Sequence, residues 1–202
     1  MFTGLIAEIG TVREARPCAA GRRFLVAAPR TASQLGIGES VACHGVCLTV
    51  ESVDAAAGTF GVAAVSATLR RTTAGAWRRG QRLHLERAVT ADERMGGHWV
   101  QGHVDGMARV ARAGRGRGGF ELWLRLPGTL RRYVVSQGSI AVDGVSLTVA
   151  GVRGGLCGVT LVPETLQRTL LGLLRAGDRM NLEVDLVAKY VESLLTGRWA
   201  LP

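Results

Sequence analysis

Lysine is nearly absent from this sequence of 202 residues: Lys189 is the only one. The other basic residues are arginines, and they give a formal net charge of +9 and a pI of about 10.8. Such a balance is often a sign of nucleic-acid binding. However, the arginines are scattered, and the basic stretch GRGRGG (114–119) is short and lies between two strand-like segments, which is typical of a surface hairpin. The charge pattern therefore argues against a nucleic-acid partner.

Long apolar runs and a secretion signal are also missing. No apolar run is long enough to span a membrane, and 47% hydrophobic with 20% charged residues argues against disorder. The start, MFTGLIAEIGTV, has no basic segment followed by an apolar stretch and a cleavage site. We therefore expect a cytoplasmic protein without a membrane partner.

Cysteines are few: Cys18, Cys43, Cys47 and Cys157. A chain with this much apolar content does not need disulfides, so we interpret all four as free thiols. Cys43 and Cys47 flank His44, but three donors without a second cluster do not make a structural metal site. The sequence therefore predicts no metal.

A fourteen-residue phrase occurs twice. Residues 40–53 read SVACHGVCLTVESV and residues 139–152 read SIAVDGVSLTVAGV, with eight identities. The opening FTGLIAEIGTV likewise matches VQGHVDGMARV. Two further matching pairs are TLRRT (68–72) with TLQRT (165–169) and GQRLHLE (80–86) with GDRMNLE (177–183). Four blocks in the same order, at offsets of 97 to 99, indicate a duplicated domain.

The boundary between the copies falls near Gly96–Gly97, which predicts units 1–97, 98–184 and 185–202. Each copy consists of short apolar and β-branched runs separated by glycine-containing turns such as HG and DG (Asp143–Gly144). This texture predicts an all-β protein built from two small antiparallel barrels or sandwiches. A barrel of this size is filled by its own side chains, so a ligand would bind at a rim or outer groove.

Helical periodicity is confined to a few segments. ATLRRTTAGAW and ETLQRTLLGLL each predict a short helix before the next strand. From Leu186 to Leu195, apolar residues recur at helical spacing, which predicts an amphipathic helix without a counterpart in the first copy. Its apolar stripe packs either against its own barrels or against the same helix of neighbouring chains.

Several motifs together resemble the riboflavin synthase family and its lumazine-binding relatives. They are MFTGLI, GVCLTV, GGHWVQGHVDG, GSIAVDGVSLTV, PETLQRT and NLEVDLVAKYVE. The resemblance runs from the first residue to about residue 195. It implies two duplicated antiparallel Greek-key β-barrels in tandem, followed by a C-terminal α-helix through which three chains assemble into a homotrimer.

The resemblance also implies an activity. Two molecules of 6,7-dimethyl-8-ribityllumazine, a pteridine, give riboflavin and a pyrimidinedione by transfer of a four-carbon unit, without a metal or an organic cofactor. The reacting pair lies between the first barrel of one chain and the second barrel of its neighbour. A duplicated pocket suits such a reaction, because two like molecules must be held face to face.

Substrate-binding residues follow from the resemblance in each copy. The first pocket is expected to use Gly4, Leu5, Ile6, Cys47, Leu48, Thr49 and a strand of Ala63, Ala64, Val65, Ser66, Ala67 and Thr68. The second is expected to use Gly102, His103, Val104, Ser146, Leu147, Thr148 and a strand of Thr160, Leu161, Val162, Pro163, Glu164 and Thr165.

Five side chains are candidate catalytic groups. Cys47 and Ser146 occupy equivalent positions, and a thiol and a hydroxyl differ in acidity and nucleophilicity. His103 is suited to proton transfer at the lumazine methyl group, or else is structural. Ser146 and Thr148 alternate along one strand and so face the same side, where Asp185 would orient them. Cys47 either assists the reaction or only packs.

Some positions depart from the family pattern. Ala67 stands where the family carries the glutamate that Glu164 retains, Gln137, a further candidate substrate-binding residue, stands where lysine is common, and His44 stands where asparagine is usual. One lost electrostatic contact costs about 10²–10³ in rate. Two alternatives therefore stay open: a paralogue acting on another pteridine-like or flavin-like molecule, and a non-catalytic lumazine or flavin carrier. His98 is interpreted as structural.

Overall fold

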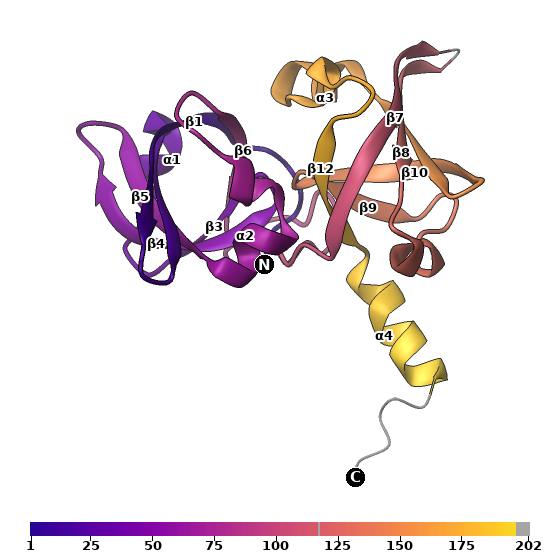
Figure 1. Ribbon diagram of the computed structural model, residues 1–202, viewed down its shortest axis with the longest axis horizontal. Coiled ribbons are helices and arrows are strands. Elements are labelled where there is room, and N and C mark those ends of the chain that lie inside the picture. Colours follow the sequence, from indigo (N-terminus) through magenta and orange to yellow (C-terminus); the bar gives the residue numbers. More distant parts are fainter. Residues whose placement is uncertain (117, 197–202) are drawn as a thin grey trace.

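The computed structural model describes residues 1–116 and 118–196. The end of the expected tail, 197–202, and position 117 in the basic stretch lie outside the described residues. Figure 1 shows two β-barrels side by side and a C-terminal helix that projects away from both. The first copy comprises β1 (Glu8–Cys18), β2 (Gly21–Ala27), α1 (Pro29–Ala32), β3 (Ser40–Cys43), β4 (Val46–Asp54), β5 (Thr59–Val65), α2 (Ser66–Arg71), the 3-10 helix η1 (Thr73–Ala76) and β6 (Arg82–Arg87). The second comprises β7 (Gly106–Gly116), β8 (Gly119–Arg125), the 3-10 helix η2 (Gly128–Tyr133), β9 (Ser139–Val142), β10 (Val145–Arg153), β11 (Leu156–Leu161), α3 (Pro163–Arg168), the 3-10 helix η3 (Leu171–Leu173) and β12 (Arg179–Val184), before α4 (Leu186–Leu195).

Both copies close into six-stranded antiparallel barrels with the same connectivity. The order is β1-β2-β5-β4-β3-β6 in the first barrel, and β6 pairs again with β1. The second barrel follows the equivalent order β7-β8-β11-β10-β9-β12, closed by the pairing of β12 with β7. The tandem barrels that the resemblance implied are therefore confirmed, and the alternative of sandwiches is excluded.

Tight turns set the register of the repeated phrase in both copies. His44 and Gly45 join β3 to β4 with φ of 51° and 78°, and Asp143 and Gly144 join β9 to β10 with φ of 46° and 81°. Positive φ at both central residues defines the hairpin turn that matches the twist of antiparallel strands. The turn predicted at Asp143–Gly144 is therefore present.

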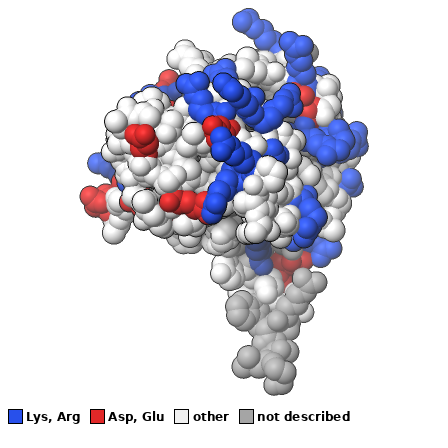
Figure 2. Space-filling model, turned by 60° about the vertical axis from the view of Figure 1, so that its left-hand side comes forward, with Lys and Arg blue, Asp and Glu red and all other residues white. Residues whose placement is uncertain are grey.

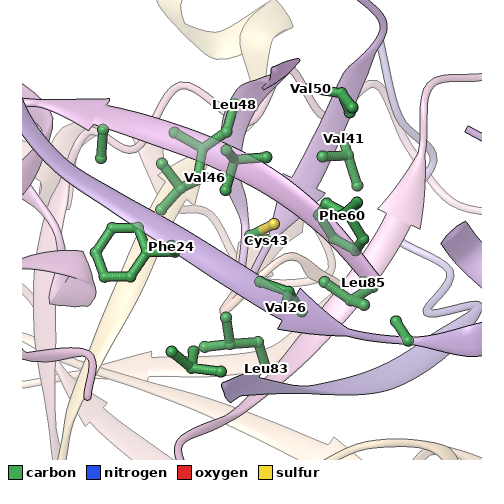
Figure 3. Close-up of a cluster of buried hydrophobic side chains, with 14 of the residues drawn as sticks. Phe24, Val26, Val41, Cys43, Val46, Leu48, Val50, Phe60, Leu83 and Leu85 are labelled. Atoms are coloured by element: carbon green, nitrogen blue, oxygen red, sulfur yellow. The ribbon is translucent and has the colours of Figure 1, made fainter. Parts of the chain in front are cut away.

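Alternation along the strands fills each barrel. On β4, Val46, Leu48 and Val50 are buried, while Cys47 and Thr49 between them are more exposed. Figure 3 shows inward side chains of the first barrel converging from several strands, among them Phe24, Val26, Val41, Cys43, Phe60, Leu83 and Leu85. The second barrel has an equivalent core of its own.

This alternation corrects part of the expected pocket lining. Leu48 and Ala64 belong to the first core, and Leu147 and Leu161 belong to the second. Their side chains therefore face the barrel interior, and a ligand outside the barrel meets only their backbone groups. Outward side chains suited to a ligand come from the intervening positions.

The expected ligand-binding strands 63–68 and 160–165 are also shorter than predicted. Strand β5 ends at Val65 and Ser66 begins α2, while β11 ends at Leu161 and Pro163 begins α3. Pro163 lacks the N–H that a strand ladder needs, and its fixed φ suits the first turn of a helix. Residues 66–68 and 163–165 therefore lie on short helices at the barrel rims.

The apolar stripe of α4 faces away from the barrels. Val187, Tyr190, Val191, Leu194 and Leu195 are between 48% and 82% exposed. The opposite side is held by ion pairs: Glu192 bonds Arg132 at 2.7 Å, and Lys189 bonds Asp105 at 2.8 Å. Packing of the stripe on its own barrels is therefore not observed.

Histidines fill the seam between the barrels. His84 is bonded through Nδ1 to the Asp143 carbonyl at 2.9 Å, and its Nε2 accepts the Leu170 N–H at 2.7 Å. The equivalent residue Asn181 donates to the His44 carbonyl at 2.9 Å. Burial, followed by the charge of His44, lowers the pKa of His84 to about 4. His44 itself accepts the His84 backbone N–H through Nδ1 at 3.1 Å. The histidine that replaces the family's asparagine at position 44 therefore packs between the two barrels.

The thiols and surface charges complete the description. All four cysteines are free, and burial raises the pKa of Cys43 and, to about 11, that of Cys157. No helix among the described residues is both long and apolar enough to cross a membrane. Figure 2 shows basic side chains over much of one face, with a few acidic ones between them.

Candidate active site

The opening segments of the two copies, residues 2–12 and 100–110, here called the openings, meet between the barrels. Phe2 and Val100 form an isolated antiparallel bridge, with N–H to carbonyl distances of 2.7 and 3.1 Å. Beyond the bridge each opening crosses to the opposite barrel. Gly102 accepts the Cys47 N–H through its carbonyl at 2.9 Å, and Gly4 accepts the Ser146 N–H in the same way, also at 2.9 Å. The repeated phrase of each copy is thus paired with the opening of the other.

A buried glutamate anchors each opening. Glu86 on β6 accepts the backbone N–H groups of Thr3 at 2.6 Å and Gly4 at 2.9 Å. Glu183 on β12 accepts those of Gln101 at 2.7 Å and Gly102 at 2.9 Å. Burial raises the pKa of both carboxyls, to about 7 for Glu183, although these hydrogen bonds oppose the shift.

The pocket assignment of the openings made from the sequence is therefore wrong. Ile6 packs against the core of the second barrel, and Val104 belongs to the core of the first. Residues 102–104 thus lie at the first site, and Gly4 and Ile6 lie against the second barrel, whereas Leu5 lines a separate pocket of about 290 Å³ with Glu86 of the first barrel. The repeat identifies equivalent residues, but it cannot say which copy of an opening crosses to which barrel.

The first site is a pocket of about 670 Å³ on the outside of the first barrel. Its size is typical of small-molecule sites. The thiol of Cys47 and the exposed imidazole of His103 both line it. The other residues around it are Val46, Ala67, Thr68, Arg70, Arg71, Thr72, Gly102, Val104 and Asp105.

Arginines give the first site a basic edge. Arg70 and Arg71 come from the last turn of α2 and were not among the residues predicted to bind substrate. Asp105 is the carboxylate of this pocket, and it is already engaged by Lys189 at 2.8 Å and by the Val184 N–H at 2.9 Å. In the sequence, these two arginines were marked only by the repeated TLRRT block.

The second site is built around Ser146. Its Oγ lies 2.7 Å from Nδ1 of His98, and the backbone N–H of His98 donates to the Thr3 carbonyl at 3.2 Å. His98 Nε2 is buried and makes no hydrogen bond to any of the described residues. Burial lowers the pKa of His98, while the charge of Asp185 opposes this shift. A neutral imidazole bonded to a hydroxyl is suited to proton transfer.

His98, interpreted as structural from the sequence, thus lies at the second site in contact with Ser146. It has no counterpart in the first copy, so the repeat gave it no emphasis. Asp185 does not hold Ser146 as expected: it caps α4 by accepting the Val187 N–H at 2.9 Å, and His98 occupies the Ser146 hydroxyl. Thr148 is exposed on the same face of β10 as Ser146, in agreement with the predicted alternation.

The departures from the family pattern fall in different places. Ala67 lines the first pocket, whereas Glu164 on α3 forms an ion pair with Arg168 in the second copy. Gln137 is exposed on a turn before β9, with a left-handed φ of 65° where the first copy has Gly38. Gln137 thus lies outside the first pocket.

The fold and the paired sites define a tandem-barrel protein of the lumazine-binding class. The family model described as the lumazine binding domain matches residues 3–88 and again residues 101–185. The structure resembles that of LumP complexed with riboflavin, with a TM-score of 0.82 and 20% identity, and that of LumP complexed with 6,7-dimethyl-8-(1'-D-ribityl) lumazine, with a TM-score of 0.81 and 19% identity. Each match covers 91% of this chain and 99% of the other.

Relatives that match over nearly the full chain show which family of the lumazine-binding class this chain belongs to. Riboflavin synthase of Mycobacterium bovis is 41% identical, and the match covers 96% of this chain and 98% of the relative. Those of Brucella abortus and Bacillus subtilis are 37% and 33% identical, with 96% of this chain covered and 98% and 90% of the relatives. The chain belongs to the riboflavin synthase family of enzymes. The family and the riboflavin synthase function predicted from the sequence are thereby confirmed.

Proposed function

We propose that this enzyme binds one 6,7-dimethyl-8-ribityllumazine at each of its two sites and transfers a four-carbon unit between two such molecules, giving riboflavin and a pyrimidinedione. The observation that carries the proposal is the pair of equivalent sites, one around Cys47 and one around Ser146, in a member of this family. No metal or organic cofactor takes part.

The two sites have unequal roles in this proposal. At the second site His98 accepts a proton through Nε2 or shares one with the Ser146 hydroxyl, with Thr148 and Asp185 close by on the same side. At the first site Cys47 and His103 contact the other lumazine. Orientation of the two rings supplies much of the acceleration, because it makes a bimolecular encounter local.

Backbone and outward side chains hold the substrates. The second site uses Gly4, Ile6, Thr160, Val162, Pro163, Glu164 and Thr165, with the backbone of Leu147 and Leu161, and Leu5 contributes from the pocket beside Glu86. The first uses Gly102, Val104, Thr49, Ala63, Val65, Ser66, Ala67 and Thr68, with the backbone of Leu48 and Ala64. Gln137 lies in the second copy, and it contributes to the site that the second barrel forms with the first barrel of a neighbouring chain.

The proposed assembly is a cytoplasmic homotrimer. The exposed stripe of α4, which includes Tyr190 and Leu194, supports this proposal because an apolar helix face needs a partner to leave water. We propose that units 1–97 and 98–184 act as the two substrate-binding barrels and that 185–202 assembles the chains. The reacting pair then lies between the first barrel of one chain and the second barrel of the next.

Lumazine turnover tests the proposal. Purified protein is incubated with 6,7-dimethyl-8-ribityllumazine, and the riboflavin formed is measured against the lumazine consumed. The expected result is one riboflavin for every two lumazines, and no riboflavin at high enzyme concentration would refute the proposal. Gln137→Lys with Ala67→Glu is expected to raise the rate, since each restores a charged group of the family pattern.

The same departures favour one alternative, a paralogue that acts on another pteridine-like or flavin-like molecule. Ala67 supports it, because the alanine removes a hydrogen-bond acceptor from the first site. Activity on a different pteridine without riboflavin formation from lumazine would favour the paralogue. Tight binding of lumazine with no turnover would instead favour a carrier.

A further inference from the structure

One ion pair distinguishes the rim helices of the two copies. On α3, Glu164 Oε1 bonds Nε of Arg168 one helical turn later. The equivalent positions on α2, at the repeat offset of 97, are Ala67 and Arg71. The arginine is therefore present in both copies, but its carboxylate partner is present only in the second.

Loss of the carboxylate leaves Arg71 unpaired beside the first pocket. Among residues 1–116 and 118–196, neither Arg71 nor its neighbour Arg70 has an ion-pair or hydrogen-bond partner. Both line the pocket. Two guanidinium groups at one edge of a pocket attract an anion, and arginine is well suited to phosphate because its donors form a planar fork.

The rest of the pocket does not neutralise these arginines. Asp105 bonds the Lys189 ammonium at 2.8 Å and the Val184 N–H at 2.9 Å, so its charge is already compensated. The other lining residues include the thiol of Cys47 and the buried Val46 and Val104, none of which carries a carboxylate. The positive charge of the pocket is thus concentrated at the end of α2, where Arg70 and Arg71 lie.

We propose that the first pocket contains a subsite for a phosphate monoester at the end of the ligand's ribityl chain, formed by Arg71 and Arg70. The inference rests on the proposed function, which supplies the ring and the ribityl chain. The ring lies against the Cys47 side, and the chain extends to α2, where its phosphate takes the place of the missing carboxylate. The enzyme therefore prefers phosphorylated ribityl ligands at its first site, but not at its second.

The test compares two commercially available ligands that do not react, riboflavin and riboflavin 5′-phosphate. Dissociation constants are measured by fluorescence titration of the full-length protein at low ionic strength, for the wild type and four variants. In the wild type the phosphorylated ligand is expected to bind about tenfold more tightly, as for a charge-assisted hydrogen bond in a partly exposed site. Equal affinities would overturn the proposal.

Two variants remove the subsite in opposite ways. Arg71→Ala deletes the guanidinium, and Ala67→Glu restores the intrahelical partner that Glu164 provides in the second copy. Both are expected to bring the ratio of the two affinities within each variant to near parity, whatever the substitution does to the affinity for riboflavin itself. A preference that survives both substitutions would contradict the proposed subsite, and circular dichroism checks that each variant is folded.

Two matched controls separate the subsite from the general positive charge. Arg153→Ala removes an exposed arginine distant from the pocket, and Arg168→Ala removes the equivalent arginine of the second copy. Both are expected to retain the preference, and an equal loss in these variants would overturn the assignment. Inorganic phosphate, compared with chloride at the same ionic strength, is expected to weaken binding of the phosphorylated ligand only; equal weakening of both ligands would reveal a general salt effect and contradict the subsite.

Lumazine turnover by the same preparations keeps this inference apart from the proposed function. Riboflavin formation without a phosphate preference would refute the subsite and leave the proposed function intact. A phosphate preference without riboflavin formation would refute the proposed function and leave the anion subsite, now on a protein of different activity. If neither ligand binds, the subsite is refuted.

Discussion

The two sites of this chain share a backbone and differ in chemistry. At the first, the outward residue of the repeated strand is Cys47, with His103 and two unpaired arginines around the pocket. At the second it is Ser146, bonded to a partly buried histidine, His98, at 2.7 Å. Duplication thus gives two sites with the same backbone, and substitutions at equivalent positions give these sites different side-chain chemistry.

The largest expected effect concerns the histidines. His98→Asn is expected to lower kcat by about 10²-fold or more, because it removes a partly buried imidazole suited to general acid–base catalysis. Ser146→Ala should cost about as much, and the double variant no more, since the two groups act as a unit. His103→Asn is the comparison from the first site and should mainly raise KM. Steady-state kinetics with lumazine measure all four, and an unchanged kcat in His98→Asn would contradict the unequal roles.

The next prediction concerns the close approach of each opening to the repeated strand of the opposite barrel. Gly4 and Gly102 have φ of 78° and 75°, and an added Cβ would lie 2.5 Å from Ser146 Cβ and 2.7 Å from Cys47 Cβ, respectively. Gly4→Ala and Gly102→Ala should each lower the free energy of unfolding by about 1–3 kcal/mol or more through strain and contact. Gly128→Ala, with no atom near its added Cβ, should stay within about 0.5 kcal/mol. Urea unfolding measures the three, and a tolerated Gly102→Ala would contradict the close approach.

A third comparison sets His84 against Asn181 at the seam. Because burial lowers the folded-state pKa of His84 to about 4, below the ordinary value of 6.5, the unfolded chain binds more protons between these two pH values. His84 therefore makes the protein lose stability as pH falls from 6.5 towards 4, by on the order of 1–3 kcal/mol.

His84→Asn, which copies the second barrel, should remove this part of the pH dependence. Unfolding free energies of both proteins are measured across that range, with the exposed His103→Asn as control. The same slope in the wild type and in His84→Asn would show that another group is responsible.

The smallest effect is expected at the thiol. Cys47→Ser gives the first site the hydroxyl that the second site has, and the backbone bond from residue 47 to Gly102 is unaffected. We expect a change in kcat well below the roughly 10²-fold typical of a lost acid–base group. A loss as large as that of His98→Asn would assign the thiol a direct part in the chemistry.

Much of this architecture could be predicted from the repeats. The strands, the paired turns and α4 follow from local patterns, because alternation, positive-φ turn residues and helical spacing are properties of short segments. Closure of each barrel does not, since it depends on the long-range pairing of β1 with β6 and of β7 with β12. The termination of β5 at Val65 was harder to predict, since Ser66 gives no strong helix signal, whereas Pro163 in the second copy does.

The candidate site was predictable only in part. Cys47, Ser146 and Thr148 could be located because strand alternation dictates which side they face. The crossing of the openings could not, because it depends on tertiary contacts such as the bonds from Glu86 and Glu183 to backbone N–H groups. The bond between His98 and Ser146 is a consequence of that crossing and was missed for the same reason.

The crossing of the openings is the claim on which the other comparisons depend, and nuclear Overhauser contacts measure it most directly. With glycine, cysteine and serine selectively labelled, the account predicts contacts from the Cys47 amide proton to Gly102 and from the Ser146 amide proton to Gly4. Contacts from Cys47 to Gly4 and from Ser146 to Gly102 would contradict it.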